Sequence, residues 1–136
     1  MRPRTYTVKH EIGCIVARKR GLGFIPADEH HLTLGGRHGA PRLGHDKTVG
    51  LNRWSHQGRP LPEYGWDAAE CRRRLGPSYA IEPDAFRALW TDTGNAEAAQ
   101  DAMLAYQNQL IADHERRTSI YPPGFSEAGH QLGDEP

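Results

Sequence analysis

The chain has 136 residues, of which 37% are apolar and 25% charged, and this size and balance suit one domain with a modest core. No apolar run approaches the ~20 residues that cross a bilayer, and no apolar stretch follows the first arginines. These features exclude a membrane-spanning helix and a secretory signal, so we expect a cytoplasmic protein that does not bind membranes.

The net charge of zero hides an asymmetry between the two halves of the chain. Residues 1–60 carry eleven Lys or Arg against four Asp or Glu, whereas residues 61–136 carry six against thirteen. Such a split is typical of a basic face for polyanions beside an acidic remainder, and equally of a dipolar surface that is only solvated. The two cysteines are too few for a disulfide-stapled secreted domain, so we expect two reduced thiols.

Short elements are predicted along the first half. Residues 1–12 are expected to form an N-terminal arm or edge strand, because Tyr6 and Val8 alternate with polar neighbours. The pattern then predicts, in order, a helical turn over 13–20, a strand over 28–34, a glycine-rich loop over 35–44 and a return strand over 49–51. Asn52 is a good N-cap and Gly58 a good stop, which predicts a short helix over 53–57 with Trp54 in the core.

Helices are predicted for the second half. After a loop over 58–66, helices are expected over 67–75, 84–92 and 96–117, the first capped by Asp67 and the last by Asn95. The last helix has an apolar stripe of Ala99, Met103, Tyr106, Leu110 and Ile111 that is typical of core packing. Residues 13–117 are thus expected to form one domain, and residues 118–136, with two adjacent prolines, a mobile tail.

Histidines gather in the first half. His30, His31, His45 and His56 lie there, with Asp46 beside His45. Imidazole is the commonest transition-metal ligand and also acts as a base near neutral pH. A strand pair followed by a helix can bring these positions to one point, although His30 and His31 point to opposite sides of a regular strand. A single histidine is usually structural, and the spacing alone leaves structure and function about equal.

The chemistry of this cluster suits phosphodiester cleavage. That reaction needs a base to activate water and a cation to neutralise charge on the phosphate and the leaving oxygen. Arginines lie along the same stretch, and we expect four of them to bind backbone phosphates: Arg37, Arg42, Arg53 and Arg59.

Several short motifs occur together in a recognisable order. They are Cys14-Ile-Val, Gly21-Leu-Gly-Phe, His30-His31-Leu, Gly44-His45-Asp46-Lys-Thr48, Trp54, His56-Gln-Gly58 and Gly76-Pro77-Ser78. Over roughly residues 13–90 the chain resembles the phage recombination-enhancement (Ref) nucleases, which belong to the HNH or ββα-metal superfamily. The resemblance implies an α+β fold with a ββα-metal core and additional C-terminal helices, and cleavage of DNA with a divalent cation.

The resemblance also implies roles for individual residues. His31 matches the general base that activates water, and His30 and His56 match the metal ligands. Asp46 would orient the base or join the ligands, and His45 is the alternative for that role. The expected cofactor is one divalent cation, Mg²⁺ or Mn²⁺, with Zn²⁺ as the alternative.

The chain departs from the family pattern at a second set of positions. The family has an early Cys-x-x-Cys and a helical Cys-x-x-His-His, and a subset of these ligands binds a structural zinc. Of these, Cys14 remains, whereas Ala17, Asn52 and Ser55 replace other ligands. One thiolate cannot hold a four-ligand zinc, so we expect no structural zinc, with the C-terminal helices or a dimer supplying the lost stability.

Two hypotheses follow. The first is a metal-dependent DNA endonuclease of a bacterial or phage-infected cell, with a part in recombination. The second is a non-catalytic DNA- or protein-binding module that retains the fold. DNA is the expected partner. A recombinase filament is less expected, because the long basic N-terminal arm of the best-known family member has no counterpart here.

Overall fold

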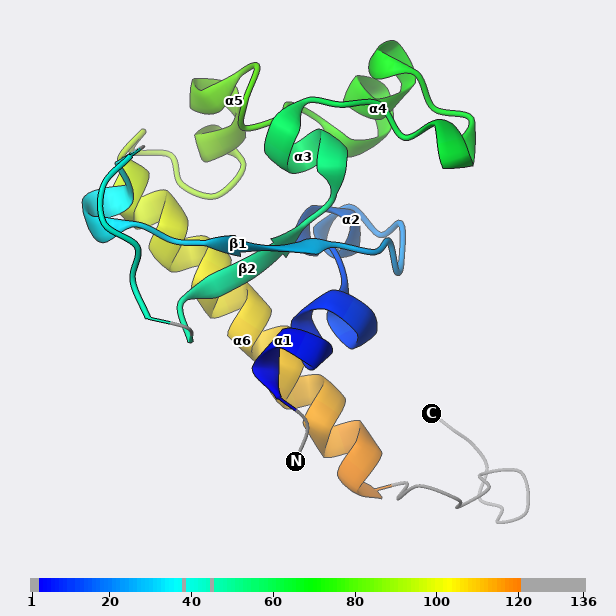
Figure 1. The fold of residues 1–136 in the computed structure, drawn as a ribbon, viewed down its shortest axis with the longest axis vertical. Helices are drawn as coiled ribbons and strands as arrows, with labels where there is room; N and C mark the ends of the chain where they lie inside the picture. Colours follow the sequence, from blue (N-terminus) through cyan, green and yellow to red (C-terminus); the bar gives the residue numbers. More distant parts are fainter. Residues whose placement is uncertain (1–2, 38, 45, 121–136) are drawn as a thin grey trace.

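The computed structural model describes residues 3–37, 39–44 and 46–120 of the chain. It is an α+β structure, in which helices surround a two-stranded antiparallel sheet (Figure 1). In chain order the elements are α1 (Arg4–Tyr6), a π-helical turn (Thr7–Ile12), α2 (Ile15–Lys19), β1 (Asp28–His31), a 3-10 turn (Leu34–Gly36), β2 (Thr48–Leu51), α3 (Arg53–Gln57), a second 3-10 turn (Pro62–Tyr64), α4 (Ala68–Leu75), α5 (Pro83–Ala88) and α6 (Ala96–Ile120). The α+β class predicted from the sequence is therefore confirmed.

The sheet is a hairpin whose long connection contains the glycine-rich segment. The register pairs His30 with Val49 and His31 with Thr48. Helix α3 begins directly after β2, because the Asn52 side chain accepts a hydrogen bond from the backbone N–H of Ser55 at 2.7 Å. The chain thus runs strand, strand, short helix, in the order that the sequence predicts.

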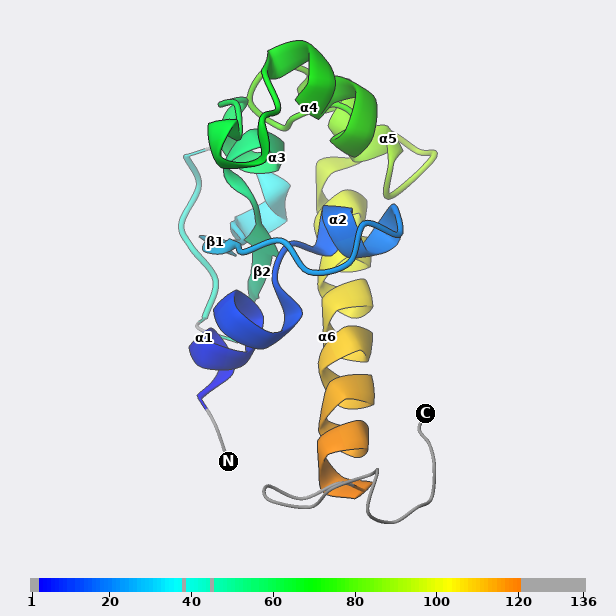
Figure 2. The same cartoon turned by 90° about the vertical axis from the view of Figure 1, so that its right-hand side faces the viewer.

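Helix α6 runs along the sheet (Figure 2). Two of its glutamine side chains bind the hairpin. Gln107 is fully buried, accepts a hydrogen bond from Gly50 N at 2.7 Å and donates one to the Thr48 carbonyl at 2.6 Å. Two helical turns earlier, Gln100 makes the same pair of bonds with the backbone of Thr33. The two amides satisfy backbone groups that a further strand would otherwise pair.

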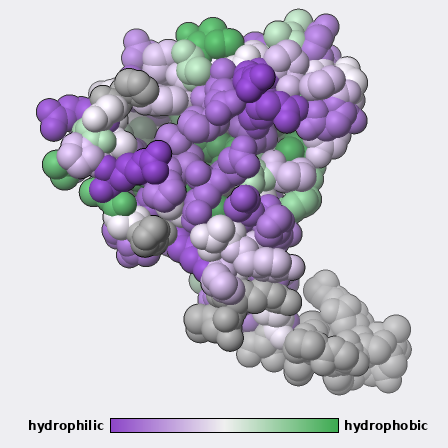
Figure 3. Space-filling view, in the orientation of Figure 1, coloured by the Kyte–Doolittle hydropathy of each residue, from purple (hydrophilic) through white to green (hydrophobic). Residues whose placement is uncertain are grey.

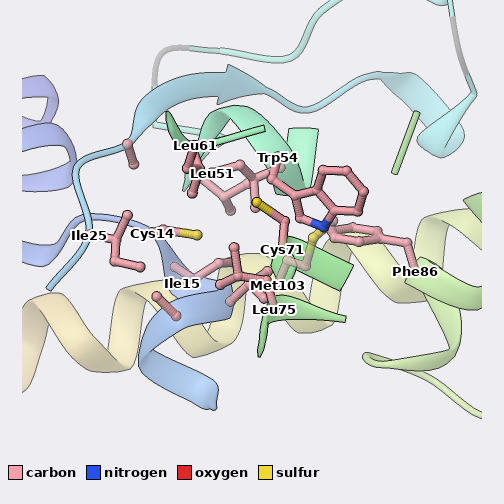
Figure 4. Packing of buried hydrophobic residues seen from close by; sticks show 14 of the residues in the cluster. Cys14, Ile15, Ile25, Leu51, Trp54, Leu61, Cys71, Leu75, Phe86 and Met103 are labelled. Carbon is pink, nitrogen blue, oxygen red and sulfur yellow. The ribbon is translucent and has the colours of Figure 1, made fainter. Parts of the chain in front are cut away.

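The core lies between the sheet, α2, α3 and the middle of α6 (Figure 4). Trp54 is 3% exposed, as predicted, and its indole Nε1 donates to the Gly76 carbonyl at 2.9 Å. Phe86 of α5 also joins this core. Cys14 and Cys71 are both buried and unpaired, which agrees with the expectation of two reduced thiols.

Residues 4–12 are helical, so the edge strand that was one of the two predictions for this segment is wrong. Val8 and Ile12 are buried, one helical turn apart, against β2 and α6, whereas Tyr6 is 46% exposed. The alternation of Tyr6 and Val8 with polar residues suggested a strand. The segment is helical instead, because a helix buries Val8 and Ile12, four residues apart, on one face.

The predicted helices of the second half are present with small shifts of their ends. Asp67 caps α4, and Asn95 accepts a hydrogen bond from Ala98 N at 2.9 Å at the start of α6. Helix α6 continues to Ile120, so the first residues of the predicted tail are helical; residues 121–136 lie outside the described part. Among the described residues, no helix is long and apolar enough to span a membrane.

Candidate functional site

The fold brings His30 and His56 together. His30 lies in β1 and His56 in the last turn of α3, and the centroids of their rings are 4.5 Å apart at an interplanar angle of 61°. The Asn52 cap starts α3 directly after β2, the strand that pairs with β1. The two predicted metal ligands are therefore neighbours in space.

Both imidazoles are held in the neutral form near neutral pH. Burial, reinforced by the neighbouring titratable groups of His56, His31 and Arg42, lowers the pKa of His30 to about 4. Burial also lowers the pKa of His56, while the carboxylate of Asp28 opposes that change. A neutral imidazole keeps a nitrogen lone pair free for a cation or a proton.

The predicted general base, His31, is the last residue of β1 and is partly buried. Strand alternation places it on the same face as Glu29, which accepts a hydrogen bond from the Thr48 hydroxyl at 2.8 Å. Its charge nevertheless contributes to the low pKa of His30, so the two side chains lie close enough to interact.

The predicted helpers of the base lie before β2. Asp46 is exposed. Burial lowers the pKa of the Arg4 guanidinium, and the negative charges of Glu29 and Asp46 partly oppose that change. Asp46 therefore lies towards α1. His45 lies outside the described residues.

The four predicted phosphate-binding arginines differ in their surroundings. Arg42 is exposed, and its positive charge contributes to the low pKa of His30. Arg37 and Arg59 are exposed in loops. Arg53 is engaged instead, because its Nη2 atom lies 2.6 Å from Glu63 Oε1.

His30 and His56 line a cavity of about 130 Å³ between the sheet, α5 and the start of α6. Gly36 is required where the glycine-rich segment closes this cavity against α6. It has a φ of +73°, and a Cβ there would lie 2.6 Å from the carbonyl carbon of Ala96.

Three residues near the pair escaped the sequence prediction. Tyr79 and Arg87 line the cavity, and Asp28 acts on the charge of His56. Asp28 had a signal, because it lies two residues before His30 and shares its face of β1. Tyr79 follows the Gly-Pro-Ser motif directly, but its half of the chain was interpreted as packing helices.

The donor set fits a cation held by two protein ligands. Among residues 3–37, 39–44 and 46–120, no three His, Cys, Asp or Glu side chains are grouped so that they could hold a metal ion together. His30 and His56 are thus the two candidate ligands that the structure places side by side.

A second cluster lies at the start of two short helices. Cys14 and Asn52 are the N-caps of α2 and α3, and Ala17 and Ser55 follow three residues later in each helix. All four are buried, and Asn52 Nδ2 donates to Cys14 Sγ at 3.2 Å. Burial raises the pKa of the Cys14 thiol. The positions that correspond to the zinc ligands of the resembled family thus lie at one buried point, occupied by a thiol, an amide, a hydroxyl and a methyl group.

Comparison of the chain with models of protein families, with curated proteins and with solved structures finds no match.

Proposed function

We propose that the protein is a metal-dependent DNA endonuclease of the HNH type. The observation that carries the proposal is the contact between His30 and His56, which come from different elements and face one cavity. Two neutral imidazoles can act as ligands of a transition-metal cation, and such a cation supplies the positive charge that phosphodiester hydrolysis needs.

The order of the elements supports this proposal. The histidine pair joins the first strand of a hairpin to the helix that follows its second strand. The buried cluster of Cys14, Ala17, Asn52 and Ser55 adds independent support. Its members were assigned from the sequence to a lost zinc site, and Cys14 and Asn52, which are 38 residues apart, are in contact.

In the proposed mechanism, His30 and His56 would hold the cation through their neutral nitrogens. The cation, when bound, supplies positive charge for the phosphate and the leaving oxygen. His31 accepts a proton from the attacking water, and Asp46 or His45 orients that base. Arg42 binds a phosphate oxygen beside the pair.

Imidazole ligands also bear on which cation is used. Mg²⁺ prefers oxygen ligands, whereas imidazole suits transition metals such as Ni²⁺ and Zn²⁺ better. With two imidazoles and no carboxylate lining the described part of the cavity, we expect Mn²⁺ or Ni²⁺ to support more activity than Mg²⁺.

Plasmid nicking with Mg²⁺, Mn²⁺, Ni²⁺ or Zn²⁺ tests the function. His30→Ala, His31→Ala and His56→Ala should each lower the rate at least about 100-fold, within the range for loss of a general base or metal ligand. His10→Ala is the control, because His10 is exposed on the N-terminal turn and should retain the wild-type rate. Cleavage that survives His31→Ala would reject the base assignment, and cleavage that survives all three would reject the site.

The second candidate function is a binding module without catalysis. The charge split between the halves favours it, as does the presence of two rather than three grouped ligands in the described residues. The face shown in Figure 3 is mostly hydrophilic, with hydrophobic residues scattered over it, which does not favour an apolar partner there. Binding of DNA with no cleavage under any of the four cations would favour this function over the first.

A further inference from the structure

Two cavities meet beside the histidine pair. The inner cavity, which His30 lines, and an open outer cavity of about 510 Å³ share three lining residues, His56, Tyr79 and Arg87. Gln57, Ala80 and Pro83 complete the outer cavity, which lies between α3 and α5. A ligand at the shared wall would touch the candidate site and extend outward.

The charge of this cleft suits an anion. The lining residues that the structure describes include no aspartate or glutamate, and Arg87 supplies a permanent positive charge. Arg87 pairs with Asp84 through one Nη atom at 3.0 Å, but the Asp84 side chain is 98% exposed. Such a pair contributes little and can exchange for a phosphate, to which a guanidinium donates two parallel hydrogen bonds.

The apolar part of the cleft suits an aromatic base. The ring of Tyr79 packs edge-on against Phe86, with centroids 5.8 Å apart, and its backbone N–H donates to the Ser55 carbonyl at 2.8 Å. Tyr79 is thus fixed in place while it lines both cavities. Bases stack on such rings without regard to sequence.

Shape decides between paired and unpaired DNA. A base in a duplex is stacked on its neighbours and enters a concave cavity only after it is flipped out, whereas an unpaired base avoids much of that cost. Tyr79, Ala80 and Pro83 form the apolar wall that such a base would contact.

We propose that the cleft between α3 and α5 binds one unpaired nucleotide of a DNA strand, with its phosphate at Arg87 and its base against Tyr79. The inference deepens the proposed nuclease function and rests on it for the position of the phosphate beside His56. It makes single-stranded or unpaired DNA the substrate class.

Fluorescence anisotropy in EDTA tests the proposal, with one labelled oligonucleotide offered as a single strand and as a duplex. Arg87→Ala should weaken binding of the single strand about tenfold and lower the slope of log K against log salt by about 0.7. Asp84→Asn should tighten binding about twofold, because it frees Arg87 and removes a nearby negative charge. Arg116→Ala is the matched control, since Arg116 also pairs with an aspartate three residues earlier on a helix, and should change binding less than twofold.

The base position has its own pair of variants. Tyr79→Phe should retain binding, whereas Tyr79→Leu should weaken it about fivefold or more. If Arg87→Ala binds single strands as tightly as Arg116→Ala, or if the duplex binds as tightly as the single strand, the proposal is wrong. The assay contains no metal, so it separates the two ideas. If the wild type binds single strands through Arg87 but does not cleave DNA, the nuclease proposal alone is wrong. If the wild type cleaves DNA and Arg87→Ala cleaves it at the same rate, the nucleotide site alone is wrong.

Discussion

At the scale of single residues, the environment of His30 links the candidate site to the stability of the fold. The imidazole is mostly buried and lies against His56, and His31 and Arg42 also disfavour its protonation. Its protonation is therefore costly in the folded chain and ordinary in the unfolded one.

This difference predicts a loss of stability in acid. Between the unfolded pKa of 6.5 and the folded value of about 4, the unfolded chain binds a proton at position 30 that the folded chain does not. The stabilisation present above pH 6.5 should therefore fall by up to about 3 kcal/mol as the pH drops towards 4, and fall no further below that. Urea unfolding in EDTA at pH 7 and pH 4.5 measures it.

His30→Gln is the control for the acid effect. It removes the titrating group but keeps a polar side chain, so its free energy of unfolding should change less between the two pH values than that of the wild type. Equal changes in both proteins would show that other groups cause the acid loss.

At the scale of elements, the attachment of α6 to the sheet depends on side-chain amides as well as on apolar contacts. Gln107 has no solvent exposure and makes two hydrogen bonds to the backbone of β2. Gln100 repeats the arrangement at Thr33. Helix α6 thereby fixes the hairpin that carries His30.

Gln107→Leu should therefore destabilise the fold despite its gain in hydrophobicity. It keeps a similar volume but leaves the Gly50 N–H and the Thr48 carbonyl buried without partners, at a cost of about 3 kcal/mol. Gln109→Leu is the matched control, because Gln109 is exposed on the same helix, and should cost less than about 0.5 kcal/mol. Chemical denaturation compares the two, and equal midpoints would contradict this role of Gln107.

The sequence predicts the elements better than their contacts. Capping residues such as Asn52 and Asp67 act locally, so the helix starts that they predict are present. Helical periodicity records only hydrophobicity, so it identified Ala99 and Met103 but gave no sign that Gln107 is in the core. A glutamine is buried when a backbone edge elsewhere in the fold needs partners, and that edge is not visible in the helix's own sequence.

The residues of the candidate site were likewise predicted only in part. His30 and His56 were selected by residue type and order, and the structure places them in contact. Arg87 was missed because nothing in its local sequence distinguishes it from a solvated helix residue; α5 packs beside the histidines only in three dimensions.

At the scale of the whole molecule, the buried cluster at the starts of α2 and α3 joins these two helices, the second of which carries His56. Cys14 and Asn52 cap these helices, and Ala17 and Ser55 lie one turn inside them. The cluster is buried and contains one thiol, and the hydrogen bond from Asn52 to Cys14 links the two helices.

Restoring the other ligands should create a metal-dependent fold. The variant Ala17→Cys, Asn52→Cys, Ser55→His supplies three new ligands beside Cys14, the number and kind that a structural zinc needs. We expect it to lose stability without metal, because the Asn52 cap is gone, and to gain at least about 5 °C in Tm with Zn²⁺.

The same variant with Cys14→Ser is the control and should gain less from Zn²⁺. Circular dichroism melts with Zn²⁺ or EDTA compare the three proteins. If the Tm of the triple variant is the same with Zn²⁺ as with EDTA, these four positions are not arranged as a ligand set.

The central claim is that His30 and His56 share one cation. Anomalous diffraction from crystals grown with Zn²⁺ as the probe ion tests it most directly. We expect a single peak about 2.0–2.1 Å from one nitrogen of each imidazole, with the remaining coordination positions of the ion open to solvent. A map with no ion between the two rings, or with an ion on one of them alone, would contradict it.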